Sequence, residues 1–330
     1  MQAVVLTETG TQPTVATIPV PQPGPGEVLV KMYASPINPS DLAFLAGGYG
    51  VKKPFPVVPG FEGSGIVVAA GKGILPKIWS GKKVACAASP KLNGCWAEYM
   101  VTNAASCVPL SKKISMEQGS MMFVNPMTAI AFFDVYKNTP NPSNKLRGII
   151  NTAAASALGR MIIRLGKQKG IPVISVVRRD EQVEMLKSEG AEFIVNSSDP
   201  DFELKIKELA HQLNATILFD AVGGKLPQQL LSAAPKGSKL FVYGRLSADV
   251  CEILPGELIF TGNQIQGFWL TNWLHEKGMI KTLLTIREVQ SLLKHELGTK
   301  INRQFPPEKI VEAIDTYKKN MSNGKVLIRF

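Results

Sequence analysis

A turn built of small residues is the first part of the sequence whose residue types and spacing suggest a ligand. Residues 152–159 read TAAASALG and put Ala154, Ser156 and Gly159 at the spacing of the glycines in a G-x-G-x-x-G dinucleotide fingerprint. Both replacements are small, so the backbone can still approach a diphosphate at the start of a helix. The alternative is a tight packing junction between a strand and a helix, without a ligand. The candidate residues for the diphosphate are Ala155, Ser156, Ala157, Leu158 and Gly159.

Two adjacent arginines suggest which dinucleotide this would be. Arg178 and Arg179 follow the apolar run at residues 172–177. In a dinucleotide-binding β-α-β unit, an acidic residue here binds the ribose 2′-hydroxyl, whereas an arginine accepts a 2′-phosphate. Because guanidinium groups match the geometry of phosphate oxygens, the pair favours NADPH over NADH as the cofactor. The alternative is a solvated pair of charges before a helix.

Cysteine and histidine side chains do not have the spacing of a metal site. A structural zinc needs closely paired ligands, and a catalytic zinc needs about three protein ligands. The sequence contains no C-x-x-C pair, and every histidine lies far downstream of the first three cysteines. We therefore predict no metal site, inert thiols and histidines at the surface. The residues concerned are Cys86, Cys95, Cys107, Cys251, His211, His275 and His295.

The elements that must position the small-residue turn and the arginines alternate regularly along the chain. From about residue 116 onward, short apolar runs alternate with segments of helical periodicity, which argues for a parallel, doubly wound sheet. The predicted strands are residues 148–151, 172–177, 193–195, 216–220 and 240–243, and the predicted helices are residues 157–169, 180–189, 201–213 and 226–234.

The first third of the chain has a different pattern, with short strands separated by Pro and Gly. Strands are predicted at residues 3–6, 28–33 and 63–70, and this spacing suggests a β-rich barrel or sandwich. Ser40 or Asp41 is the expected cap of a short helix. The chain is predicted to end with a long helical segment, a helix at residues 307–319 and a strand at residues 325–328.

Length and charge set the outer limits of these predictions. The chain has 330 residues, with 37 Lys and Arg against 26 Asp and Glu, which gives a net charge of +11. This length predicts two domains, and the composition excludes a largely disordered chain and a disulfide scaffold. The basic balance fits nucleic acid, an anionic membrane or a phosphate-rich cofactor. The Lys and Arg are dispersed, so nucleic-acid binding is not predicted.

Membrane and targeting segments are not visible in the sequence. A transmembrane helix needs about 18 consecutive apolar residues, and no such stretch occurs. The first residues, MQAVVLTETG, match neither a secretory signal nor a transit peptide. We therefore expect an intracellular protein, either cytoplasmic or in the mitochondrial matrix.

Four ordered segments identify a family resemblance: PGPGEVLVK at residues 23–31, ASPINPSDL at 34–42, PVVPGFEGSGIVVAAG at 56–71 and WAEYM at 96–100. The chain resembles the zinc-free branch of the medium-chain dehydrogenase/reductases, which includes NADPH:quinone oxidoreductases and mitochondrial 2-enoyl thioester reductases. Phe61 stands where zinc-binding relatives carry His. The resemblance implies a GroES-like β-rich catalytic domain at residues 1–120 and 268–330 around a Rossmann domain at 121–267. It also implies a homodimer formed by edge strands of the Rossmann sheets.

The same resemblance suggests the residues of an active site. Residues 38–41 and 47–49 resemble the enoyl thioester reductase pattern in which the tyrosine, here Tyr49, is catalytic. Residues 267–273, GFWLTNW, resemble that group's segment beside the nicotinamide. The substrate pocket would include Asn38, Phe268 and Trp269, and further cofactor contacts would come from Asn125, Thr128, Tyr243 and Gly244.

Each of these assignments has a plainer structural alternative. Asn38 would form an Asx-turn and Asn125 a helix cap, and the two aromatic residues of the pocket would be core residues. Tyr49 would only line the pocket, and Lys325 would be a solvated strand residue.

The expected function is that of an oxidoreductase. It is an NADPH-dependent reductase of an α,β-unsaturated carbonyl, in particular a 2-enoyl thioester, with hydride transfer from the cofactor and a proton from Tyr49. One alternative is an NADPH:quinone oxidoreductase. Another is a catalytically silent member of the family that serves as a subunit of a larger, for example mitochondrial, assembly.

Overall fold

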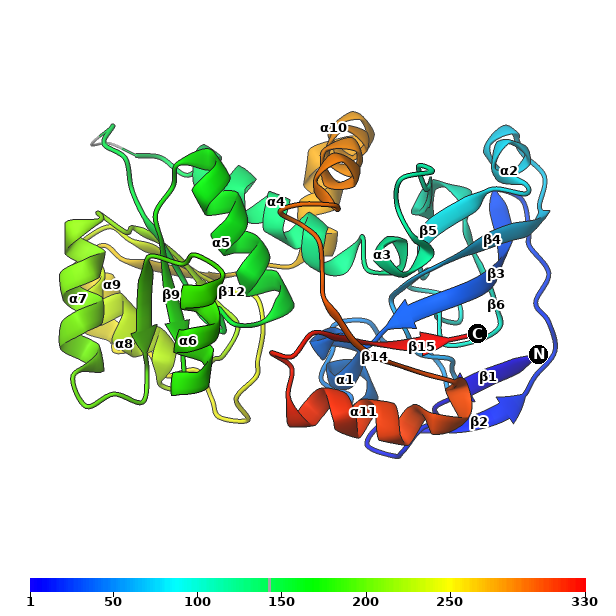
Figure 1. The fold of residues 1–330 in the computed structure, drawn as a ribbon, viewed down its shortest axis with the longest axis horizontal. Coiled ribbons are helices and arrows are strands. Elements are labelled where there is room, and N and C mark those ends of the chain that lie inside the picture. The colour runs from blue at the N-terminus through cyan, green and yellow to red at the C-terminus, as the bar shows by residue number, and fades with distance from the viewer. Residues whose placement is uncertain (142–143) are drawn as a thin grey trace. The chain divides into compact units, whose positions relative to one another are not determined.

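The protein is described by a computed structural model, which covers residues 1–141 and 144–330 (Figure 1). The chain forms two compact units, one made of Met1–Met127 with Leu284–Phe330 and the other of Thr128–Leu283. Both divisions fall inside helices, namely α4 (Val124–Asn138) and α10 (Leu270–Leu292). The boundaries that the family resemblance implies are at residues 120/121 and 267/268.

The first unit is built on a mostly antiparallel sheet in the order β14-β15-β3-β4-β5-β7, with β6 also paired to β3. Strand β15 comes from the far end of the chain and pairs with β3 in antiparallel register, so the C-terminal segment completes this sheet. A separate antiparallel pair is formed by β1 and β2. The strands are β1 (Gln2–Val5), β2 (Thr14–Thr17), β3 (Glu27–Pro36), β4 (Glu62–Ala70), β5 (Lys83–Ala87), β6 (Tyr99–Asn103), β7 (Cys107–Pro109), β14 (Ile301–Phe305) and β15 (Lys325–Arg329).

Short helices close the first unit around apolar clusters. Helix α11 (Ile310–Lys319) buries Ile314 and Tyr317, at helical spacing, in the same cluster as Trp96 and Ile328. The predicted helix at residues 307–319 is therefore present, although its first turn is the 3-10 helix η2 (Pro307–Lys309). The remaining helices are α1 (Pro39–Leu45), α2 (Ile74–Trp79), η1 (Ala104–Ser106) and α3 (Met116–Ser120).

The second unit contains a six-stranded, fully parallel sheet in the order β10-β9-β8-β11-β12-β13. The chain moves outward from β8 through β9 to β10 and then returns to the other side of β8 for the last three strands. The point of reversal lies between β8 and β11, where doubly wound sheets bind their ligands. The strands are β8 (Ile149–Asn151), β9 (Val173–Val177), β10 (Phe193–Asn196), β11 (Ile217–Asp220), β12 (Lys239–Val242) and β13 (Gln264–Gly267).

Helices cover both faces of this sheet. Helices α7 and α8 bury Ile206 and Leu230 against one face, and Phe132 of α4 stacks on Phe219 on the other. The alternation therefore has the doubly wound form that was predicted, and the predicted fold class is confirmed. The helices are α5 (Ala157–Lys169), α6 (Asp180–Ser188), α7 (Phe202–Gln212), α8 (Leu226–Ala233) and α9 (Pro255–Ile259), with α4 and α10 at the ends of the unit.

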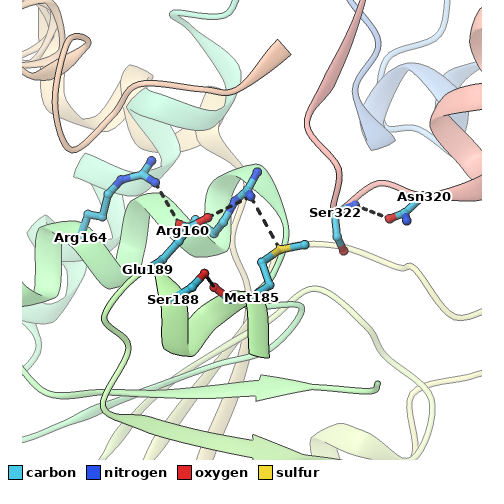
Figure 2. Close-up of polar contacts among 7 residues, drawn as sticks. All are labelled: Arg160, Arg164, Met185, Ser188, Glu189, Asn320 and Ser322. Atoms are coloured by element: carbon cyan, nitrogen blue, oxygen red, sulfur yellow. Dashed lines mark hydrogen bonds and ion pairs between the residues drawn. The ribbon is translucent and has the colours of Figure 1, made fainter. Parts of the chain in front are cut away.

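A charge cluster fixes α5 to the end of α6 (Figure 2). Glu189, directly after α6, accepts from Arg160 Nη1 at 3.1 Å and from Arg164 Nη1 at 3.3 Å, and both arginines lie on α5. Arg160 is buried, so its ion pair with Glu189 is shielded from water more than a surface ion pair. The cluster thus holds α5, which follows the small-residue turn, against α6, which follows Arg178 and Arg179. Among the described residues, no helix is both long and apolar enough to cross a membrane.

Candidate active site

The carboxyl ends of β8 and β11 are joined by a buried clamp at the switch point. Thr152 Oγ1 donates to Asp220 Oδ1 at 2.8 Å and accepts from the N–H of Ala221 at the same distance. The other carboxylate oxygen accepts from the N–H of Gly223 at 2.7 Å. Burial raises the pKa of Asp220, and these hydrogen bonds oppose the shift. Neither Thr152 nor Asp220 was predicted to have a role, although Thr152 directly follows β8 and Asp220 is the last residue of β11.

The small-residue turn leads directly into α5 and leaves donors unpaired. Ser156 caps the helix, since its Oγ accepts from the N–H of Gly159 at 3.1 Å. A Cβ at Gly159 would lie 2.3 Å from the carbonyl oxygen of Ala154, so this position requires glycine. The first-turn N–H groups of Ala157 and Leu158 have no intrahelical acceptor, and none is found among the described residues. The positive end of the helix dipole and these donors suit a diphosphate.

Arg178 and Arg179 follow β9, as predicted. Arg178 is exposed, and its backbone N–H donates to Gln182 Oε1 at 3.1 Å. Arg179 is the residue before α6, and its Nε lies 3.9 Å from Oε2 of the exposed Glu181. This long ion pair leaves the guanidinium groups able to pair with a phosphate. The unpaired N–H groups at the start of α5 and the two arginines before α6 thus lie in the same unit.

Aromatic side chains gather at the carboxyl ends of the last strands of this sheet. The ring of Phe132 is stacked on Phe219 at 3.9 Å and meets the edges of Tyr243 at 4.8 Å and Phe268 at 4.9 Å. Tyr243 and Phe268 are half-buried, so both the pocket and the core interpretation of Phe268 have a structural basis. Trp269, one residue further on, is also half-buried.

Three further residues, Gly244, Asn125 and Thr128, were predicted to contact the cofactor. Gly244 is half-buried, and a Cβ there would approach the carbonyl oxygen of Ala221 to 2.9 Å. Asn125 is half-buried in the first turn of α4, and Thr128 is buried one turn later. Because α4 begins at Val124, Asn125 lies within the helix rather than at a cap.

Tyr49 lies in the loop after α1 in the first unit. It is half-buried, and the centre of its ring is 4.7 Å from that of Phe61, which in turn meets Phe44 edge-on at 5.7 Å. Aromatic packing thus orients the candidate proton donor. Phe61, which replaces the zinc-ligand histidine of related sequences, is the residue that supports it.

Asn38 is completely buried, and both ends of its amide are occupied. Its Nδ2 donates to Glu62 Oε1 at 2.9 Å, and its Oδ1 accepts from Lys325 Nζ. The prediction that Lys325 is solvated is wrong, because β15 lies inside the sheet and only 2% of Lys325 is exposed. The expected pocket amide is therefore an internal connector, and no part of it is exposed to bind a ligand.

The cap of α1 also differs from the expectation. The helix starts with Pro39, a residue favoured at the first helical position, so the cap is Asn38 rather than Ser40 or Asp41. Asp41 instead reaches back, and its Oδ2 accepts from the N–H of Asn38 at 2.8 Å. Its Oδ1 accepts from the N–H of Phe61 at 3.1 Å.

Asp41 should make the stability of the fold depend on pH. Burial raises its pKa to about 7, against the opposing effects of the hydrogen bond from Asn38 and of the charge on Lys325. Between about pH 4 and 7 the folded protein therefore holds a proton that the unfolded chain has lost. The free energy of unfolding should fall as the pH rises through this window, by up to about 1.4 kcal/mol per pH unit.

We expect Asp41→Asn to flatten this pH dependence in urea denaturation curves recorded from pH 4 to 7. Asp315→Asn, which changes an exposed carboxyl group in the same unit, is the control and should keep the wild-type slope. Equal slopes in wild type and Asp41→Asn would contradict the assignment of the titration to Asp41.

The described residues contain no group of three or more His, Cys, Asp or Glu that could hold a metal ion. Cys86, Cys95 and Cys107 are buried and Cys251 is exposed. Burial raises the pKa of Cys107 to about 12, so its thiol is protonated and unreactive at neutral pH. The cysteine, histidine and carboxylate side chains that the structure describes therefore do not fit a zinc ion.

Comparisons with known proteins agree with this architecture. Residues 24–112 match the alcohol dehydrogenase GroES-like domain, and residues 157–285 match the family described as zinc-binding dehydrogenase. The mitochondrial enoyl-[acyl-carrier-protein] reductase of Caenorhabditis elegans is 30% identical over 305 residues, which cover 90% of this chain and 84% of that protein. The chain belongs to the medium-chain dehydrogenase/reductase superfamily. The family prediction is thus confirmed.

Other members of the superfamily match over most of their length. The mitochondrial enoyl-[acyl-carrier-protein] reductase of Arabidopsis thaliana is 29% identical over 308 residues, or 90% of this chain and 77% of that protein. A crystal structure from Mesorhizobium loti, provisionally described as an NADPH:quinone reductase, is 36% identical. It has a TM-score of 0.92 and covers all of this chain and 98% of its own. The superfamily relatives therefore carry the names of two kinds of reductase.

Proposed function

We propose that this chain is an NADPH-dependent oxidoreductase that reduces the carbon–carbon double bond of a 2-enoyl thioester. The observation that carries the proposal is the presence, in one doubly wound unit, of unpaired N–H groups at the start of α5 and of two arginines after β9. The first feature suits a diphosphate and the second a 2′-phosphate. The enoyl reductase relatives support the oxidoreductase class and suggest the substrate class.

NADPH would supply the hydride. The residues of this chain would bind the dinucleotide: the N–H groups of Ala157 and Leu158 would donate to the diphosphate, and Arg178 and Arg179 would pair with the 2′-phosphate. Tyr243, Gly244 and Phe268, at the carboxyl ends of β12 and β13, would contact the nicotinamide end, together with Asn125 and Thr128 of α4.

Reduction of an enoyl thioester also requires a proton and stabilisation of negative charge. Addition of hydride to the β-carbon moves an electron pair toward the thioester oxygen, and a proton must then reach the α-carbon. Tyr49 would supply that proton, because an ordinary phenol has a pKa of about 10 and is protonated at neutral pH. Phe61 and Phe44 would hold its ring in place. Trp269 would contact the substrate.

The alternative function is an NADPH:quinone oxidoreductase. The description of the 36%-identical M. loti structure favours it. Reduction of a quinone delivers hydride to an acceptor that becomes a stable hydroquinone, so it does not need a proton placed on carbon. Tyr49 would then be dispensable for turnover.

The oxidation of NADPH by the purified chain, followed at 340 nm, distinguishes these functions. Crotonyl-CoA and a soluble benzoquinone are the two acceptors. Turnover with crotonyl-CoA is the expected result, and activity with the quinone alone would replace the first proposal by the second. A fluorescence titration with NADPH tests the remaining alternative, since a chain that does not bind NADPH would be a silent member of a larger assembly.

We infer that two copies of the chain pair through β13. This strand is the last of its sheet, so one of its edges has unpaired N–H and C=O groups. The segment that leads into it exposes Ile259 and Phe260, which are 69% and 80% accessible in the single chain. Apolar side chains of this kind beside an open strand edge favour pairing with a second copy. Sedimentation equilibrium should give twice the chain mass of 35.8 kDa, and a monomer at micromolar concentration would contradict the inference.

A further inference from the structure

A continuous chain of buried hydrogen bonds joins β15, the turn before α1, β4 and the start of α4 in the first unit. Lys325 Nζ donates to Asn38 Oδ1, and Asn38 Nδ2 donates to Glu62 Oε1 at 2.9 Å. Glu62 Oε2 accepts from the N–H groups of Phe123 at 2.8 Å and Val124 at 3.0 Å, where α4 begins. Asn38, Glu62 and Lys325 are each at most 2% exposed, so water cannot replace a missing partner.

The two ends of this chain can only donate. The Lys325 ammonium contains only donor atoms, and the backbone N–H groups of Phe123 and Val124 are likewise donors only. Asn38 brings one donating and one accepting end. All of these hydrogen bonds can form together only if the side chain at position 62 accepts both from Asn38 and from the backbone N–H groups. An ionised carboxylate can do so, whereas a neutral amide or carboxylic acid cannot.

We propose that Glu62 is a positioning residue that must stay ionised, and that it holds the first turn of α4 and the turn before α1 in their working geometry. Three titratable groups face one another here, namely Glu62, Lys325 and Asp41, with the ring of Tyr317 at 5.7 Å from Lys325 Nζ. Lys325 is the positive charge that compensates Glu62 through the amide of Asn38. Burial acts against both charges, since it raises the pKa of Glu62 and lowers that of Lys325 to about 8.

The position of Glu62 links the two parts of the first unit that carry candidate site residues. The first turn of α4 holds Asn125, a proposed cofactor contact, and α1 leads to the loop that carries Tyr49. This part of the inference rests on the proposed function. The geometric part, that Glu62 secures the first N–H groups of α4, does not.

A pair of substitutions can move the carboxylate from position 62 to position 38 without changing the shapes of the two side chains or their total charge. Glu62→Gln puts an amide N–H against either Asn38 Nδ2 or the backbone N–H groups, so one link must fail. Asn38→Asp alone puts two carboxylates face to face. In the double variant, the new carboxylate at position 38 accepts from Lys325 and from the new amide at position 62, whose oxygen accepts from Phe123 and Val124, so every link is restored.

The first readout is hydrogen exchange of the amides of Phe123 and Val124, since Glu62 is the acceptor for both. We expect Glu62→Gln to speed exchange at these amides by at least ~10-fold and to lower Tm by about 5 °C. We expect N38D/E62Q to recover most of both losses. Thr102→Val, which removes a partly buried 2.7 Å hydrogen bond to Ala87 elsewhere in the unit, is the control and should lower Tm without affecting these two amides.

The second readout is the kinetics with NADPH. Glu62→Gln should raise the KM for NADPH and lower kcat, the double variant should recover both, and Thr102→Val should change neither. Unchanged exchange in Glu62→Gln, or a double variant no better than that single variant, would overturn the proposal. If exchange and Tm follow the expected pattern but wild type does not turn over NADPH, the hydrogen-bond chain stands and the proposed function fails.

Discussion

Replacing Tyr49 with Phe should lower kcat for an enoyl thioester by ~10²–10⁴-fold while the Kd for NADPH stays unchanged. That range is typical when a side chain that transfers a proton in the transition state is removed. The substitution removes only the hydroxyl group, and the ring that packs against Phe61 at 4.7 Å is kept. The loop should therefore retain its conformation, and the loss should appear in turnover rather than in binding.

Steady-state kinetics with crotonyl-CoA, together with an NADPH titration, checks this expectation. Tyr99→Phe is a matched control, because Tyr99 is a half-buried tyrosine on β6 of the same unit. It should leave kcat unchanged. A Tyr49→Phe protein with wild-type kcat would show that Tyr49 only lines the pocket, whereas a raised Kd for NADPH with normal kcat would assign it to cofactor binding.

The largest expected effect on cofactor choice comes from replacing both Arg178 and Arg179 with Ala. Charge-assisted hydrogen bonds contribute about 1.5–3 kcal/mol each, so losing the phosphate contacts should reduce the preference for NADPH over NADH by ~100-fold or more. Arg178 is exposed, and Arg179 makes no side-chain hydrogen bond at the cap of α6. Removing these side chains should therefore leave the fold unaffected.

The ratio of kcat/KM for NADPH to that for NADH measures this preference directly. Arg303→Ala, at an exposed arginine of the first unit, is the control and should keep the wild-type ratio. Equal losses with both cofactors would show that the arginines contact a part that the two dinucleotides share. An unchanged ratio would mean that they are the solvated charges of the alternative interpretation.

The Rossmann half of the protein was predictable because its signals are local. Helix α5 was predicted at the observed residues, since its apolar residues recur at helical spacing within a stretch of 13 residues. The position of Arg178 and Arg179 directly after β9 was also predictable, because the apolar run that forms the strand ends just before them. Alternating periodicity also predicts a parallel sheet, whereas the order of its strands and the switch point between β8 and β11 come from the structure.

The first unit could not be predicted to the same depth, because its polar contacts join distant parts of the chain. Lys325 and Asn38 are 287 residues apart, and Glu62 reaches Val124 across 62 residues. Nothing in the local sequence distinguishes Lys325 from a solvated strand residue. The units divide inside α4 and α10, so no loop between elements marks either division.

The pairing of β15 with β3 has a consequence for how the protein is made. The Rossmann unit is one uninterrupted stretch, Thr128–Leu283, so all of it has been synthesised before any residue of β14 or β15. The first unit begins earlier and finishes later, because residues 34–36 of β3 have their partner only when residues 325–329 are made, whereas residues 27–31 pair with the earlier strand β6. On the ribosome, the second half of the fold can therefore be completed before the first. The partly built sheet must keep an open strand edge until translation is almost over.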